Sequence, residues 1–330
     1  KRSHDDQGSP KTQAYSNPNV STLSVYTYKS PLAIHFIPAS QEGTLLAPMI
    51  SAVFGTRVRH EVFSLCSNAE GSFLLLDETL HRELFGGSGS ARWSCLYIHE
   101  SSTETSGAEL AGALSLLCDR LATAHVPVLN VCTLARNFML VKSTVAETAL
   151  ATLRTAVTSP DGPPAAVNLS TEHASKAAMA AGVRLHLLGG SYAIGSLSVD
   201  QLKACSHAIL HLLFLQKLRP TFAHYFEMAG EISLALNETS LKALHKSEPA
   251  SASALEAALE PHLSRGWRVL DITAPAGGDG IGILGAVCRP LASLPLMNFS
   301  TLDHTFVLFP EVHLDKALER LRPHFDIVHD

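Results

Sequence analysis

The sequence predicts an α+β fold built from four tandem ferredoxin-like modules of the order βαββαβ, with helices on one face of each antiparallel sheet. Three observations lead to this prediction. They are a long internal repeat, the alternation of strand-like and helix-like apolar spacing within it, and a two-residue connection of hairpin length. We therefore expect the chain of 330 residues to form two similar halves, each holding two modules.

The repeat aligns residues 125–154 with residues 293–322 at a constant offset of 168 and without a gap. Ten of the thirty aligned positions are identical, including Pro127/Pro295, Asn130/Asn298 and Thr133/Thr301. Shorter matches lie upstream: Trp93 with Trp267, Cys118 with Cys288, and residues 76–84 with residues 236–244 at an offset of 160. A duplicated segment of this length indicates a duplicated structural unit.

Apolar spacing predicts the elements of the second module in order. Residues 92–99 form a strand, and leucines at helical spacing follow between residues 110 and 121. Residues 127–134 and 137–141 are two apolar runs joined by two residues, which predicts a hairpin. Residues 145–153 then present a second helical face. The order is strand, helix, strand, strand, helix.

The other modules follow the same order. In the fourth module residues 325–329 supply the closing strand of the βαββαβ unit. In the third module residues 183–188 are the first strand, residues 202–215 a helix, residues 231–236 a strand and residues 240–245 the start of a helix. The expected domains are a disordered tail (1–20), module one (21–88), module two (89–157), a linker (158–182), module three (183–262) and module four (263–330).

Composition excludes several classes of function. The net charge of −5 and the lack of a basic stripe argue against a nucleic-acid partner. The six cysteines are scattered in apolar runs without any CxxC pair, which is typical of buried thiols in a reducing compartment. The longest apolar run, residues 208–215, is too short to span a membrane.

The most suggestive chemical motif is the GxGxxG of Gly280–Gly285, with Asp303 about twenty residues later. A dinucleotide site is disfavoured because the strand before Asp303 continues directly into residues 306–309 as a hairpin, without a crossover helix. Two interpretations stay open. The loop amides bind a small anion such as a carboxylate, or the glycines only allow a tight turn. Asp279 is a candidate helix cap.

No pattern in the sequence predicts catalysis. The seventeen histidines show neither HExxH nor HxH spacing, and no Cys/His cluster predicts a metal site. A nucleophile elbow, a phosphate-binding Walker loop and a kinase signature are all absent from the sequence. We expect a protein that is not an enzyme and that needs no cofactor.

Several segments resemble the CASTOR/GATS-like family of cytosolic proteins, which consist of four ACT modules. The resemblance covers residues 20–155 and 183–328 in colinear order. It rests on the Trp93 and Trp267 strand openings, Leu23–Val25, Phe63–Leu65, Phe73–Glu78, His125–Leu129, Phe138–Val141 and Ser300–Glu311.

The resemblance implies a cytosolic sensor that binds a free amino acid between its second and fourth modules. It also implies a homodimer through the first and third modules, and a TOR-pathway regulatory complex as a partner. The matching ligand-binding positions are Pro127, Val128, Asp279, Gly280, Ile281, Gly282, Thr301, Leu302 and Thr305.

The chain departs from the family at several of these positions. Gly280 and Thr305 stand where the family has acidic residues, and Pro127 stands where it has a serine. A guanidinium buried without carboxylates is costly to desolvate, so we expect a neutral amino acid to be preferred over arginine. The family's partner-contacting Tyr-Gln-x-Asp reads Leu134–Asn137 here, which changes the surface that would meet the complex. A ligand-free scaffold and a regulatory subunit of a biosynthetic enzyme are the alternatives.

Overall fold

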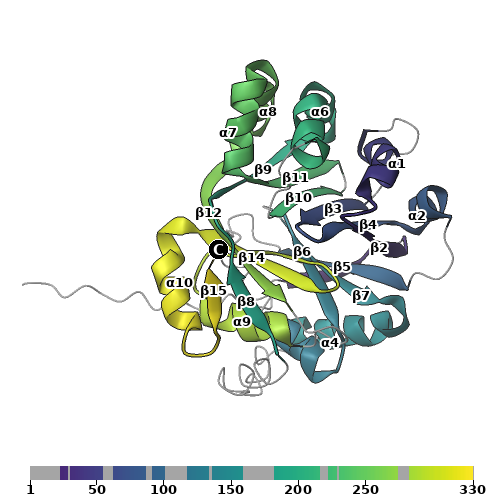
Figure 1. Cartoon of the computed structure of the whole chain (residues 1–330). Coiled ribbons are helices and arrows are strands. Elements are labelled where there is room, and N and C mark those ends of the chain that lie inside the picture. Colours follow the sequence, from purple (N-terminus) through teal and green to yellow (C-terminus); the bar gives the residue numbers. More distant parts are fainter. Residues whose placement is uncertain are drawn as a thin grey trace, which may run out of the picture.

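The computed structural model describes residues 23–28, 30–54, 62–86, 91–100, 117–133, 136–158, 182–215, 222–228, 230–273 and 282–329. The protein is a mixed fold of helices and strands (Figure 1). Across these ranges no helix combines the length and the apolar character needed to cross a bilayer. The predicted tail and nearly all of the predicted linker lie outside the described residues.

The first half of the chain, residues 23–158, alternates strands and helices as the periodicity predicts. Its strands are β1 (Leu23–Thr27), β2 (Leu32–Pro38), β3 (Val62–Asn68), β4 (Gly71–Asp77), β5 (Arg92–Glu100), β6 (Val128–Cys132) and β7 (Asn137–Lys142). Its helices are α1 (Glu42–Phe54), α2 (Glu78–Phe85), the short η2 (Ser143–Val145) and α4 (Ala146–Thr158). Residues 117–123 are also helical, and the first part of that predicted helix lies outside the described residues.

The second half, residues 182–329, has a matching set of elements. Its strands are β8 (Arg184–Leu187), β9 (Tyr192–Ser198), β10 (Phe222–Met228), β11 (Glu231–Asn237), β12 (Ser264–Thr273), β13 (Met297–Ser300), β14 (His304–Pro310) and β15 (Ile327–His329). Its helices are α6 (Val199–Phe214), α7 (Glu238–Ser247), α8 (Pro249–Leu259), η3 (Glu260–His262), α9 (Ile283–Leu291), η4 (Glu311–His313) and α10 (Leu314–Leu321).

The two halves pair their strands in the same order. The first half runs β6-β7-β5-β2-β4-β3 and the second runs β13-β14-β12-β9-β11-β10, with every neighbouring pair antiparallel. One long strand in each half, β5 or β12, therefore joins two modules. In β12 the register shifts between Ser264 and Trp267, where Gly266 has a φ of 73°. A bulge of this kind lets one strand turn from one sheet into the next.

The first strand of each half completes the sheet of that half's second module, which the sequence did not predict. β1 pairs with β5, and β8 pairs with β12. The prediction that residues 183–188 begin the third module was therefore wrong. That module begins with β9, which we did not predict. Apolar periodicity identifies a strand but carries no information about the distant partner with which it pairs.

The closing strand of the fourth module is also a correction. Residues 325–329 contain β15, but β15 pairs in parallel with β8 and not with β12. β8 occupies the place beside β12. Leu185 and Leu187 of β8 are at most 3% exposed, whereas Val328 of β15 is 56% exposed. The more apolar strand thus takes the buried position, and β15 is left at the edge.

The halves join at two seams and close the strands into a ring. β6 pairs with β13, β3 pairs with β10, and β12 pairs with both β9 and β14. At one seam Val131 pairs with Phe299, 168 residues apart, and at the other Leu65 pairs with Tyr225, 160 residues apart. These are the two offsets of the internal repeat. Equivalent residues meet where a two-fold axis passes, so the halves are related by a pseudo-two-fold axis through both seams.

Polar contacts on this axis repeat the same relation. The Asn130 side-chain amide donates to Asn298 Oδ1 at 2.5 Å, and Ser64 Oγ lies 3.0 Å from His224 Nε2. Both pairs are buried. Because unpaired polar groups are costly in a core, these contacts also fix how the halves register.

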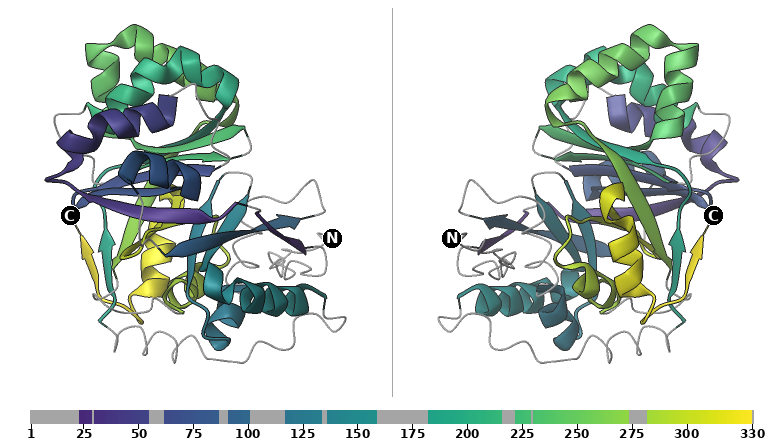
Figure 2. Two further views of the ribbon diagram at one scale, coloured as in Figure 1. Left: turned by 90° about the vertical axis from the view of Figure 1, so that its right-hand side faces the viewer. Right: turned by 90° about the vertical axis from the view of Figure 1, so that its left-hand side faces the viewer.

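Two apolar clusters hold the ring in place. One lies under α1, α6, α7 and α8, which gather at one end of the molecule (Figure 2). The other fills the ring and extends under α4, α9 and α10. Inside the ring aromatic rings pack on one another, as between Phe222 and Phe306 at 4.5 Å and between Phe138 and Phe226 at 5.2 Å. The ring is therefore a filled core.

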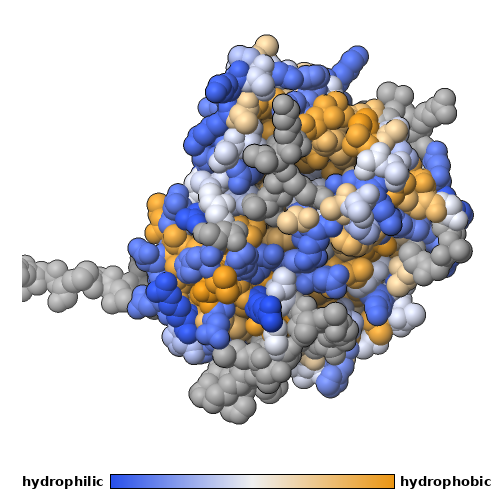
Figure 3. Space-filling view, in the orientation of Figure 1, coloured by the Kyte–Doolittle hydropathy of each residue, from blue (hydrophilic) through white to orange (hydrophobic). Residues whose placement is uncertain are grey.

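α6 confirms the predicted helix at residues 202–215 and its partial burial against the other half. It packs against α7 and α8 of its own half and against α1 of the first half. Ser198 and Gln201 form a capping box that fixes its start. Apolar side chains remain visible on the surface over α6 (Figure 3). Leu215, just beyond its end, is 47% exposed.

Candidate functional site

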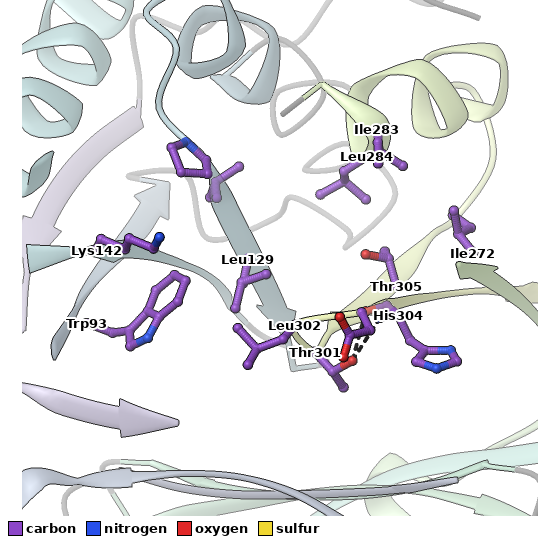
Figure 4. Close-up of a pocket in the computed structure, with 13 residues that line it drawn as sticks. Trp93, Leu129, Lys142, Ile272, Ile283, Leu284, Thr301, Leu302, His304 and Thr305 are labelled. Atoms are coloured by element: carbon purple, nitrogen blue, oxygen red, sulfur yellow. Dashed lines mark hydrogen bonds between the residues drawn. The ribbon is translucent and has the colours of Figure 1, made fainter. Parts of the chain in front are cut away.

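A cavity of about 180 Å³ lies where the second and fourth modules meet (Figure 4). Its walls come from the second module's β5, β6 and β7, and from the fourth module's β12, the first turn of α9 and the β13–β14 hairpin. The lining residues are Trp93, Pro127, Val128, Leu129, Lys142, Ile272, Ile283, Leu284, Thr301, Leu302, Asp303, His304 and Thr305.

Five of the nine residues expected at a ligand site line this cavity: Pro127, Val128, Thr301, Leu302 and Thr305. They come from segments more than 170 residues apart. Gly282 is the N-cap of α9, and the next two residues of α9 line the cavity. Asp279, Gly280 and Ile281 lie outside the described residues. The fold thus brings the described candidates together at one place.

The hairpin is antiparallel, as the sequence predicted. Met297 to Ser300 pair with Leu308 to Thr305. Asp303 therefore lies in a tight turn and not at the end of a parallel strand, so the dinucleotide interpretation of the glycine motif fails.

The threonine hydroxyls of this hairpin serve the turn itself. The His304 backbone N–H donates to Thr301 Oγ1 at 3.0 Å, and the Thr301 N–H donates to the His304 carbonyl at 2.7 Å. In the first half the Arg136 N–H donates to Thr133 Oγ1 at 2.9 Å in the same arrangement. The identity of Thr133 and Thr301 in the repeat therefore has a structural cause. Thr305 Oγ1 lies 3.2 Å from Ser300 Oγ.

His304 carries the most perturbed charge at the cavity. Its Nδ1 lies 2.9 Å from Asp271 Oδ1, and its Nε2 lies 3.3 Å from Glu70 Oε2 in the turn between β3 and β4. Burial lowers the pKa of His304, but the hydrogen bond and charge of Asp271, with Glu70 beside it, outweigh burial and raise the pKa to about 9. The imidazolium thus links the hairpin of the fourth module to the first module.

The cavity also holds one cation and one anion from opposite modules. Lys142 ends β7 of the second module, and Asp303 lies in the hairpin turn of the fourth. Both side chains are exposed. Within the described ranges neither has an ion-pair or side-chain hydrogen-bond partner. A ligand that carries both charges would find a counter-charge on each wall.

The start of α9 brings backbone amides close to the cavity. Gly282 has a φ of 77°, a left-handed conformation that favours glycine, and no side chain caps this helix. Inside α9, a Cβ at Gly285 would lie 2.6 Å from Asp119 Oδ1, and Asp119 pairs with Arg289 at 2.6 Å. The glycine motif therefore serves both a left-handed turn and a close approach to the neighbouring helix.

Sequence reasoning missed most of the apolar wall and the cation. It found Trp93 only as a repeat marker, and it did not select Leu129, Ile272, Ile283 or Leu284. Lys142 had a signal that we did not use: its partner in the repeat is Pro310, so the position breaks the symmetry of the two halves. A residue that differs between duplicated modules is a candidate for a role that only one of them has.

The described residues offer no evident nucleophile or metal site. No cluster of three metal-ligating side chains occurs among them. Burial raises the pKa of the Cys95, Cys132 and Cys288 thiols to about 12, which keeps them in the unreactive thiol form. Burial also lowers the pKa of His224 to about 3.

Comparison with known proteins gives little support for any assignment. No protein-family model matches the chain, and no curated protein matches its sequence. A protein of unknown function from Vibrio cholerae is 14% identical over 43% of this chain and 94% of its own, with a TM-score of 0.30. A protein from Agrobacterium tumefaciens is 20% identical over 45% and 93%, with a TM-score of 0.33. Aspartate kinase from Synechocystis is 12% identical over 94% and 56%, with a TM-score of 0.31. Likenesses this weak assign neither a family nor an activity.

Proposed function

We propose that this chain is a non-enzymatic regulatory protein of four ACT modules. In this proposal a free amino acid binds between the second and fourth modules, and the chain signals through a changed protein interface. The cavity of about 180 Å³ suits a ligand of this size, since pockets for larger drug-sized molecules start at roughly 300 Å³.

The observation that carries the proposal is the difference between the two seams beside and opposite the cavity. β3 and β10 pair along their whole length, from Val62 with Met228 to Asn68 with Phe222. β6 and β13 pair in register only at Val131 and Phe299. The cavity lies beside this narrow seam and takes its walls from both sides. A ligand there would add contacts where the protein itself has few.

This arrangement supports a regulatory role by simple linkage. A ligand shifts an equilibrium only by its difference in affinity between two states. An amino acid that touches β6 and the β13–β14 hairpin at once binds the closed seam more tightly than an open one. His304 and Glu70 connect the same hairpin to the first module, so closure reaches a surface away from the cavity.

The proposed partners follow from the sequence resemblance and are a second copy of the chain and a TOR-pathway regulatory complex. The strand edges of β3 and β10 are paired within the chain, so a homodimer through the first and third modules would use their helices. The apolar surface over α6 is consistent with that (Figure 3). Light scattering at micromolar concentration tests the dimer, and a monomer would count against it.

A second candidate function is that of a scaffold without a ligand. The observation that favours it is the engagement of Thr301 and Thr305 in the hairpin, which explains these residues without any bound molecule. In that case the cavity would be a packing gap between modules, and only protein partners would bind.

Calorimetry and thermal melting with each of the twenty amino acids separate the two candidates. A bound ligand raises the melting temperature by mass action, and 100-fold excess over Kd stabilises by about 2.7 kcal/mol. The sensor proposal expects at least one amino acid to bind with a single site per chain. If none binds at millimolar concentration, the scaffold is the better description.

A further inference from the structure

We infer that the cavity selects an α-amino acid with an uncharged, aliphatic side chain, whose carboxylate pairs with Lys142 and whose ammonium pairs with Asp303. This inference rests on the proposed function and adds the class of ligand and two specificity-determining residues. Neither residue is among the positions that the sequence singled out for binding.

The first step concerns the charges that the cavity offers. Among the described lining residues, the charged side chains are Lys142, Asp303 and His304. His304 is engaged at both ring nitrogens by Asp271 and Glu70, so it has no free donor for a ligand. Lys142 and Asp303 have no partner within the described ranges. One cation and one anion on opposite walls match the two charges of an amino-acid backbone.

The second step concerns the rest of the surface. Trp93, Leu129 and Leu302 lie on the same side as Lys142, while Ile272, Ile283 and Leu284 lie across the cavity (Figure 4). Ile272 is 1% and Leu284 6% exposed, so they form a fixed apolar wall. The hydroxyls of Thr301 and Thr305 are used within the hairpin. The side chain of a ligand therefore meets mainly hydrocarbon, and burying apolar area there is favourable.

The third step excludes charged side chains. An arginine or lysine ligand would need a second carboxylate, but Asp271 is neutralised by His304. A second ligand cation would also face Lys142 across a small cavity. An acidic ligand would bring a second carboxylate into a wall of isoleucine and leucine, where an unpaired charge is costly. Leucine, isoleucine, valine and methionine meet neither penalty.

The test measures binding of leucine and arginine by calorimetry to the full chain and to Lys142→Met and Asp303→Asn. Loss of one charged contact is expected to weaken leucine binding about 10-fold or more, because such bonds contribute roughly 1.5–3 kcal/mol. Lys203→Met, an exposed lysine on α6, is the matched control and should leave the affinity unchanged. Melting temperatures of the ligand-free variants check that each still folds.

Two modified ligands assign each charge to its partner. Leucinamide lacks the carboxylate, so its weaker binding should not change further in Lys142→Met. N-acetyl-leucine lacks the ammonium and should be insensitive to Asp303→Asn in the same way. If leucine binding is unchanged in Lys142→Met, or arginine binds more tightly than every aliphatic amino acid, this inference is wrong while the proposed function stands. If no amino acid binds the wild-type chain, the proposed function itself fails.

Discussion

His304 is the residue where the two halves of the chain exchange charge. Its imidazolium lies between Asp271 of β12 and Glu70 of the β3–β4 turn. Glu70 is 65% exposed, so most of the electrostatic stabilisation comes from the nearly buried Asp271. Such a site holds a proton that the unfolded chain would release at neutral pH.

The first prediction concerns the pH dependence of stability. The folded-state pKa of His304 is raised from 6.5 to about 9, so its stabilisation is complete below pH 6.5 and disappears as the pH rises through 9. His304→Gln should lower the free energy of unfolding at pH 6, by at most about 3 kcal/mol, and by much less at pH 9.5. Denaturant unfolding across this range measures the difference. A deficit of equal size at every pH would contradict the assignment.

His224 is the opposite case at the pseudo-two-fold axis. It is 1% exposed, its Nε2 lies 3.0 Å from Ser64 Oγ, and its ring lies 4.0 Å from that of Phe299. Its Nδ1 has no hydrogen-bond partner within the described part of the chain. Burial keeps this histidine neutral at pH values where the unfolded chain would protonate it.

The second prediction follows from that lowered pKa of about 3. Between pH 6.5 and 3 the unfolded state binds a proton that the folded state refuses, so His224 lowers stability as the pH falls. The double change Ser64→Ala with His224→Phe should reduce the slope of unfolding free energy against pH by up to about 1.4 kcal/mol per pH unit. The exposed His262→Gln is the control and should keep the wild-type slope. An unchanged acid slope in the double variant would show that His224 titrates normally.

At the scale of elements, α9 and the hairpin form one wall of the cavity because of how each begins. The hairpin turn is fixed by Thr301 and the backbone of His304. α9 begins after a left-handed Gly282, near which a Cβ would meet only Ala122 at 3.7 Å. There is space for a larger residue at this position, so the backbone conformation and not crowding sets its cost.

The third prediction tests the glycine at this helix start. Gly282→Val should abolish amino-acid binding because a β-branched residue strongly disfavours this φ and would move the start of α9. The fold should survive, since the change lies at a loop end and not in the core. Calorimetry measures binding and circular dichroism measures the fold. Binding that persists unaltered would remove the loop from the site.

The whole molecule behaves as a pair of related halves joined in one chain. Both seams place repeat-equivalent residues opposite each other, Val131 with Phe299 and Leu65 with Tyr225. A homodimer with two-fold symmetry has the same geometry. Each half alone would leave the edges of two strands unpaired, which proteins generally avoid.

The fourth prediction is that the halves recombine when they are separated. Fragments ending at residue 158 and starting at residue 182, when co-expressed, should form a 1:1 complex, as measured by light scattering after size exclusion. Phe299→Lys at the axis should prevent the association, because it places a charge at a position that is 2% exposed. Val312→Lys, at 86% exposure, is the matched control. Fragments that are folded and fail to associate would contradict this view of the seams.

Much of the local structure could be predicted from the sequence. The ungapped repeat indicated the hairpins at residues 127–141 and 295–309 and the helices that follow them, because apolar period and turn length are local properties. The same repeat selected Pro127, Val128, Thr301, Leu302 and Thr305, which line one cavity. The role of Thr301 was less clear, since its hydroxyl holds a turn.

The sequence by itself determined that the chain is duplicated, where most strands and helices lie, and which segments face each other across the repeat. Only the tertiary structure decided that β1 and β8 complete the sheets of the second and fourth modules, and that β15 is left at an edge. It also placed Lys142 and Asp303 on opposite walls of one cavity. The physical reason is that periodicity reports which face of an element is buried. The choice of a distant partner depends on the competition between strands for the same edge, as between Leu185 and Val328.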